Sequence, residues 1–122
     1  MNPYVPLKTR LETERLRLAA EALERVLADL ATVIRPGVTT RDLDQVARLA
    51  LARHGLEGVL EGYDGFPAAI CASVNNVAAH GIPDARELAE GDVITVDVSA
   101  HRAGALADAA WTYGVGRIGT EQ

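Results

Sequence analysis

The feature that most constrains the fold of this chain is a pair of alternating segments joined by a polar turn near its carboxyl end. Residues 92–99 (DVITVDVS) carry apolar side chains at every second position, and residues 106–115 read as a returning strand. Such alternation is typical of a strand with one buried face. The intervening residues 101–104 (HRAG) are turn formers, so the sequence predicts a β-hairpin.

This hairpin brings two aspartates together. If the turn is centred on Arg102 and Ala103, Asp97 pairs directly with Asp108. Directly opposed side chains lie about 4.5–5.5 Å apart, and like charges there repel. Carboxylates held so close share a proton or hold a cation between them. The alternative is that both are solvated on an open polar face, as is common for antiparallel sheets.

The other face of the hairpin is expected to be the core side. By the same alternation it carries these residues: Ile94, Val96, Val98, Ala105, Ala107, Ala109, Trp111 and Tyr113.

Capping signals predict two helices ahead of the hairpin. Thr9 and Glu12 form a capping-box pattern that starts a helix with leucines at helical spacing, and Pro36–Gly37 should end it. The pattern from Thr39 to Asp42 starts a second helix, which Gly55 should stop. We expect both helices to serve in packing only. His54, at the end of the second helix, is expected to interact favourably with the helix dipole.

Short β segments are expected after the second helix, at residues 59–60, 68–74 and 77–79. Two helices followed by strands predict an α+β fold. We expect residues 1–122 to form a single domain, in which two helices pack on a mostly antiparallel β-sheet.

Composition excludes several classes of partner. Apolar residues make up 48% of the 122 residues, as in a globular chain, and a net charge of −5 does not suggest a nucleic-acid partner. The single cysteine excludes an internal disulfide. We find neither an amino-terminal signal pattern nor an apolar run long enough for a membrane, so we expect a cytoplasmic location.

A second group of candidate functional residues lies between the helices and the hairpin. His80 stands before a Gly-Ile-Pro turn, where a rigid backbone suits a binding loop, although a lone histidine is usually structural. Tyr63, Phe66 and Cys71 are apolar or soft side chains close to it in sequence. They are predicted to line a small hydrophobic pocket or, equally, to belong to the core.

Five motifs in order resemble one known family. They are the opening helix with RPGVTT at 35–40, GYDGFP at 62–67, ICASVN at 70–75, HGIP at 80–83 and EGDVITVDVS at 90–99. Together they resemble type I methionine aminopeptidase, a metallopeptidase with the pita-bread fold, over about residues 9–116. The resemblance implies half of a pita-bread fold, its amino-terminal half. It also implies removal of the amino-terminal methionine from nascent proteins by peptide hydrolysis assisted by two metal ions.

The resemblance also implies a role for each candidate. Asp97 matches an aspartate that binds one of two divalent ions, and Asp108 matches the aspartate that bridges both. The metal would be Mn, Fe, Co or Zn. His80 matches a catalytic histidine that contacts the substrate. Tyr63, Phe66 and Cys71, together with that histidine, match the binding site for an amino-terminal Met peptide.

Two departures from the family pattern bear on activity. Ala107 and Ala109 flank Asp108 where the family has Gly and a hydroxyl residue, which weakens the support of that ligand. The family's remaining ligands, one histidine and two glutamates, have no counterpart in this sequence. We therefore expect weak or incomplete metal binding and no activity of the chain by itself, with a homodimer or a second-lobe partner completing the fold. The alternative is a non-catalytic pita-bread half-domain that acts as a binding or assembly module.

Overall fold

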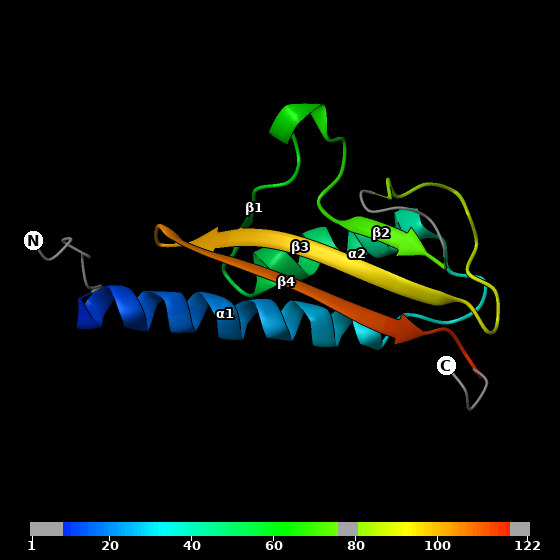
Figure 1. The fold of residues 1–122 in the computed structure, drawn as a ribbon, viewed down its shortest axis with the longest axis horizontal. Coiled ribbons are helices and arrows are strands. Elements are labelled where there is room, and N and C mark those ends of the chain that lie inside the picture. The colour runs from blue at the N-terminus through cyan, green and yellow to red at the C-terminus, as the bar shows by residue number, and fades with distance from the viewer. Residues whose placement is uncertain (1–8, 76–80, 118–122) are drawn as a thin grey trace, which may run out of the picture.

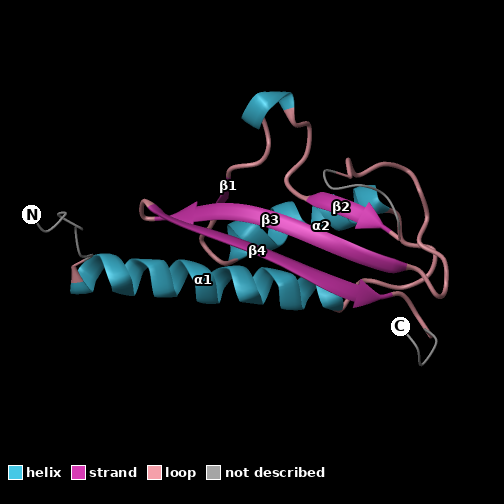
Figure 2. Ribbon diagram, viewed as in Figure 1, coloured by secondary structure: helices cyan, strands magenta, loops and turns pink. Residues whose placement is uncertain are grey.

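The computed structural model describes residues 9–75 and 81–117. Two helices, α1 (Arg10–Ala31) and α2 (Thr40–Arg53), precede a four-stranded antiparallel sheet. The strands are β1 (Glu57–Gly58), β2 (Cys71–Val74), β3 (Val93–Arg102) and β4 (Ala105–Gly114), with a short 3-10 turn η1 (Tyr63–Gly65) between β1 and β2. Both helices lie against the same face of the sheet, α1 alongside β4 and α2 behind the strands (Figures 1 and 2). The predicted α+β architecture is confirmed.

Both helices begin where the capping patterns predict. The Thr9 hydroxyl accepts the Glu12 N–H at 3.0 Å, and the Glu12 carboxylate accepts the Thr9 N–H at 3.4 Å. Thr39 and Asp42 repeat the arrangement in α2. Each cap of this kind typically stabilises a helix by about 0.5–2 kcal/mol. The first helix ends at Ala31, ahead of the expected stop at Pro36–Gly37. Beyond Ala31 the backbone N–H groups of Thr32 and Val33 bond to carbonyls three residues earlier, which tightens the last turn.

The core lies between the helices and the centre of the sheet. β3 is the central strand, with β1 and β2 along one edge and β4 along the other. Its fully buried side chains Ile94, Val96 and Val98 pack against the apolar stripes of the helices. The largest fully buried residues of those stripes are Leu23, Val26, Leu30 and Leu43.

The short strands differ in extent from the prediction. β1 covers Glu57–Gly58 instead of residues 59–60, and β2 begins only at Cys71 instead of residue 68. The strand expected at 77–79 lies outside the described residues. No helix in the described ranges is long and apolar enough to cross a membrane.

The hairpin turn lies one residue later than the sequence analysis assumed. Arg102 pairs with Ala105, so the two turn residues are Ala103 and Gly104, with φ of 51° and 83°. Positive φ at both central positions is the signature of a type I′ turn, whose twist matches that of the flanking strands. Gly104 adopts this conformation without strain, whereas Ala103 does so at a cost that the long hairpin offsets.

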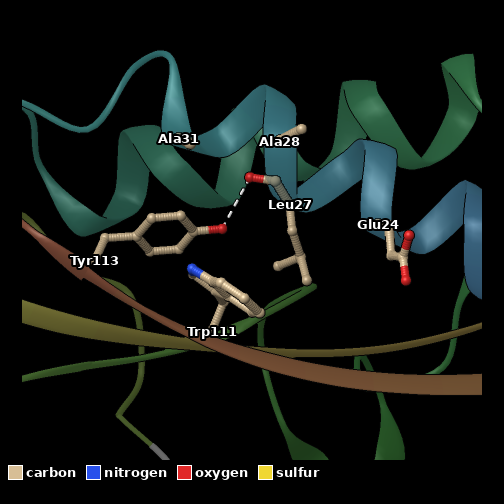
Figure 3. Close-up of a pocket in the computed structure, with 6 residues that line it drawn as sticks. All are labelled: Glu24, Leu27, Ala28, Ala31, Trp111 and Tyr113. Atoms are coloured by element: carbon tan, nitrogen blue, oxygen red, sulfur yellow. Dashed lines mark hydrogen bonds between the residues drawn. The ribbon is translucent and has the colours of Figure 1, made fainter.

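Trp111 is the exception on the predicted core face. Ala105 and Ala107 of the same strand are buried as predicted, but Trp111 is 61% exposed. Its neighbour Tyr113 is half-buried and donates a hydrogen bond from its hydroxyl to the Leu27 carbonyl of α1 at 2.8 Å (Figure 3). The face was predicted correctly, but α1 does not reach over the indole, so Trp111 is not a core residue.

Candidate active site

The face of the sheet turned away from the helices carries the two candidate metal ligands. Asp97 lies opposite Ala110 of β4, and Asp108 lies opposite Ser99 of β3. The direct pairing of the two aspartates was therefore wrong, because the turn lies one residue later than assumed. They share a face but are diagonal neighbours, a relation that places Cα atoms about 7–8 Å apart.

A hydroxyl group from the neighbouring strand contacts Asp108. The sequence predicts that this aspartate lacks the hydroxyl partner found beside it in the family, because position 109 is alanine. In the structure, the Ser99 hydroxyl donates a hydrogen bond to Asp108 Oδ1 from across the hairpin. The carboxylate is therefore oriented by β3 instead of by its own strand.

These carboxylates do not by themselves complete a metal centre. Divalent ions take four or more ligands from proteins and water. Within residues 9–75 and 81–117, no group of three or more His, Cys, Asp or Glu side chains could hold an ion. The donor chemistry of Asp97 and Asp108 suits a divalent ion, but the described residues supply only part of a coordination shell.

An apolar pocket adjoins Asp97. It has a volume of about 440 Å³, in the range of small-molecule sites. Its lining brings together the three predicted pocket residues with others that sequence reasoning did not select: Leu60, Tyr63, Asp64, Gly65, Phe66, Pro67, Cys71 and Ile82. Pro67 and Ile82 belong to the recognised motifs at 62–67 and 80–83, and Leu60 lies two residues before the first of them, so membership of a motif or proximity to one was the signal that could have found them.

Cys71 lines this pocket and also lies next to the face of the sheet that carries Asp97 and Asp108. It is the first residue of β2 and pairs directly with Asp97 of β3, so the two side chains are neighbours on one face. Burial raises the pKa of the Cys71 thiol, and the negative charge of Asp97 raises it further. The thiol therefore stays protonated at neutral pH and presents a soft, neutral surface to the pocket.

A polar network between α2 and the following segment holds the pocket wall in place. Asp44 is buried, and its Oδ1 accepts the backbone N–H groups of Ala69 and Ile70 at 2.8 and 3.2 Å. Arg48 donates to Asp44 at 2.9 Å and forms a two-point ion pair with Glu61 at 2.6 and 2.8 Å. The network therefore ties both ends of the 61–70 segment to one helix.

Close backbone contact fixes the segment that enters this site from the other side. The Gly81 carbonyl accepts the Ala72 N–H of β2 at 2.9 Å. A Cβ at position 81 would lie 2.2 Å from the Ala72 carbonyl oxygen, so only glycine fits. The neighbouring Ile82 lines the pocket. His80, the predicted catalytic histidine, lies outside the described residues.

Comparison with known proteins places the chain in a family. Residues 14–122 match metallopeptidase family M24, and the chain belongs to that family. Among curated proteins it is 40% identical over 115 residues to a methionine aminopeptidase of Clostridium perfringens, a match that covers 94% of this chain. It is also 40% identical over 111 residues to methionine aminopeptidase 1 of Bacillus subtilis, covering 91% of this chain.

A solved structure of the same class has the same fold. The methionine aminopeptidase of Thermotoga maritima superposes with a TM-score of 0.88 at 33% identity, over 96% of this chain and 47% of that protein. The chain covers 46% of the C. perfringens relative and 45% of the B. subtilis relative, so it spans about half the length of the curated relatives it matches. The resemblance to methionine aminopeptidases and the half of the pita-bread fold are therefore confirmed.

Proposed function

We propose that this chain supplies the methionine-binding pocket and two of the metal-binding carboxylates of a methionine aminopeptidase. The observation that carries the proposal is the pairing of Cys71 with Asp97, which sets an apolar, sulfur-lined pocket beside an acidic face. A thioether side chain fits a soft apolar pocket of this kind. The pocket would hold the methionine side chain, while the acidic face would lie near the peptide's amino group.

We assign a role to each candidate residue from this arrangement together with the family resemblance. Tyr63 and Phe66 would contact the methionine side chain, and Cys71 would form the base of the pocket. His80 would contact the substrate during hydrolysis, as the family resemblance implies. Asp97 and Asp108 would bind divalent metal, which supplies a water molecule of lowered pKa when bound. The remaining metal ligands would come from outside the described residues. The protein would act in the cytoplasm, where nascent chains are made.

Methionine binding provides the first test. Backbone amide shifts of the 122-residue chain are followed by NMR during titration with L-methioninamide, with glutamine amide as the polar control of similar length. We expect shifts confined to residues around Phe66 and Cys71, and at least tenfold weaker binding by Phe66→Ala. Leu49→Ala, which removes an exposed leucine from α2, is the matched control and should bind like wild type. Equal binding of both amides would contradict the proposal.

Metal binding provides the second test. Mn²⁺ is titrated into wild type, Asp97→Asn and Asp108→Asn, since asparagine keeps the side-chain shape and removes the charge. We expect weak binding by wild type and a clear loss in both variants, because each carboxylate contributes to the same face. Asp64→Asn, which changes an acidic residue at the outer side of the pocket, is the control. Indistinguishable titrations of all four proteins would refute the metal assignment.

A non-catalytic assembly module is the second candidate function. The incomplete donor set among the described residues and the alanines that flank Asp108 favour it. The two candidates differ in a peptide assay. Release of methionine from a Met-Ala-Ser peptide by the chain with Mn²⁺ would exclude the module. Methionine-selective binding without release would leave the chain as the binding half of the enzyme.

A further inference from the structure

The pocket loop, residues 60–66, supplies most of the residues that line the apolar pocket, yet packing does little to hold it. Leu60, Tyr63 and Phe66 belong to it, and none of the described residues 60–66 is buried. Tyr63 lines the pocket although it is 75% exposed. Figure 1 shows the turn η1, which lies within this loop, standing away from the sheet. The position of the loop is therefore set mainly by polar contacts.

Hydrogen bonds within the pocket loop determine its shape. The Gly62 N–H donates to the Phe66 carbonyl at 2.8 Å, and the Phe66 N–H donates to the Tyr63 carbonyl at 2.9 Å. Gly62 has a φ of 85°, which glycine adopts without strain, so the chain can turn sharply at this residue. Because these bonds join loop residues to one another, they do not determine where the loop lies relative to α2.

An ion pair at the amino-terminal end of the loop connects it to α2. Arg48 of α2 contacts both carboxylate oxygens of Glu61: Nη1 donates to Oε1 at 2.6 Å, and Nη2 donates to Oε2 at 2.8 Å. The Nε of the same guanidinium donates to Oδ2 of the buried Asp44 at 2.9 Å. Two parallel bonds fix the direction of a carboxylate as well as its distance. The ion pair therefore fixes Glu61, and with it the start of the loop, relative to the helix.

Both members of this pair are charged at neutral pH. Hydrogen bonds from Arg48 lower the pKa of the Glu61 carboxyl, and hydrogen bonds from Glu61 and Asp44 raise the pKa of the Arg48 guanidinium. The contact with Glu61 lies at the surface, and ion pairs at the surface contribute little to folding stability. A contact of this strength can still decide the position of a loop that packing holds only weakly.

We propose that Arg48 and Glu61 are positioning residues for methionine: they hold the pocket loop in the arrangement that binds the side chain, and so set the affinity of the pocket without contacting the ligand. The inference rests on the proposed function, because it takes the ligand to be a methionine side chain. When the pair is broken, the loop spends only part of its time in the binding arrangement, and the apparent affinity falls by that fraction. The usual strength of a surface ion pair corresponds to a loss of about two- to fivefold.

The dependence of binding on salt distinguishes this role from direct packing. Salt screens exposed charges, since the Debye length falls from about 10 Å at 0.1 M to about 3 Å at 1 M. Burial of apolar surface is not weakened by added salt. Between these two concentrations, the affinity for L-methioninamide should therefore fall more in wild type than in Glu61→Gln, in which position 61 is uncharged. Attraction of the ligand's amino group to Asp97 is common to both proteins, so it does not affect the comparison.

Titration of the 122-residue chain with L-methioninamide, followed by NMR shifts of the backbone amides, tests the proposal. Glu61→Gln keeps the side-chain shape, and Arg48→Lys keeps the positive charge but cannot make the two-point contact. We expect the dissociation constant to rise about two- to fivefold in each variant. The double variant should bind no more weakly than either single one, because both changes break the same contact.

Glu21→Gln is the matched control, because it removes a carboxylate from another exposed arginine–glutamate pair, on α1. It should bind like wild type. The urea midpoints of Glu61→Gln and Glu21→Gln should stay close to that of wild type, so that weaker binding cannot be ascribed to unfolding. Equal affinity of wild type and Glu61→Gln, or equal salt dependence in these two proteins, would overturn the proposal.

Backbone ¹⁵N relaxation tests the position of the loop without any ligand. Order parameters and relaxation dispersion together cover motions from picoseconds to milliseconds. We expect increased motion at Tyr63, Asp64 and Gly65 in Glu61→Gln, and none at Ala69 and Ile70, whose N–H groups Asp44 still accepts. A pocket loop that is equally ordered in wild type and Glu61→Gln would overturn the positioning role.

The two measurements also separate this inference from the proposed function. If wild type does not bind L-methioninamide but Glu61→Gln loosens the loop, the proposed function fails and the positioning of the loop by Arg48 and Glu61 is supported. If wild type binds selectively, while affinity and loop motion are unchanged in Glu61→Gln, the proposed function stands and this inference fails.

Discussion

Replacing Asp44 by alanine should destabilise the chain far more than replacing an exposed charged residue by alanine. Asp44 is 6% exposed and accepts the buried N–H groups of Ala69 and Ile70, as well as a bond from Arg48. Alanine leaves both N–H groups without an acceptor, and each such buried group costs about 1–3 kcal/mol. We expect the free energy of unfolding to fall by about 3–5 kcal/mol, a large share of the ~5–15 kcal/mol typical of a domain.

Urea denaturation followed by circular dichroism measures this loss. Glu61→Ala is the matched control, because it removes the exposed end of the same network and should cost no more than about 1 kcal/mol. The loss of unfolding free energy in Asp44→Asn should lie between the losses in Asp44→Ala and Glu61→Ala. The amide oxygen of asparagine can still accept an N–H, but its amide nitrogen would face Arg48. If Asp44→Ala costs no more than Glu61→Ala, the buried carboxylate does not hold the pocket wall and the reasoning fails.

Three further outcomes are expected. Gly81→Ala should destabilise the chain by at least ~2 kcal/mol, because its Cβ would overlap the Ala72 carbonyl; a urea midpoint within error of wild type would contradict the close contact. Hydrogen bonds from Thr39 lower the pKa of Asp42. The stabilisation that the ionised Asp42 gives should therefore be complete above the ordinary pKa of about 3.9 and be lost as the pH falls below that value. The melting temperature of Asp42→Asn should depend less on pH in this range than that of wild type, and an identical pH dependence would refute the contribution of the cap. Because the pKa of Cys71 is raised and its side chain is buried, its thiol should react with Ellman's reagent at pH 8 far more slowly in the folded chain than in urea; equal rates would show that the pocket wall opens freely.

Local signals predicted the elements of this fold well. The starts of both helices follow from Thr9 and Thr39, because a capping box requires only residues three apart. The buried face of β3 follows from strict alternation, and three of the pocket residues, Tyr63, Phe66 and Cys71, follow from one short stretch of sequence. These features depend on neighbours in the chain, which a sequence displays directly.

Features that depend on distant partners were harder to predict. The register of the hairpin depends on whether Ala103 or Gly104 takes the second turn position, and alanine at positive φ is an unusual choice. The exposure of Trp111 depends on how far α1 extends over β4. Asp44 was missed because an aspartate within a helix reads as a solvent-facing residue, and only the fold reveals the N–H groups it accepts.

In the described part of the chain both helices pack on one face of the sheet, and this arrangement also affects how such a chain can change during evolution. Along β3, Ile94, Val96 and Val98 pack into the core, while Thr95, Asp97 and Ser99 point to the open face. Mutations at the second set therefore alter chemistry at little cost in folding stability, and mutations at the first set do the opposite. A duplicate of this chain could lose or exchange its carboxylates one at a time and still fold. The same strand can thus keep its packing while the side chains of its other face change.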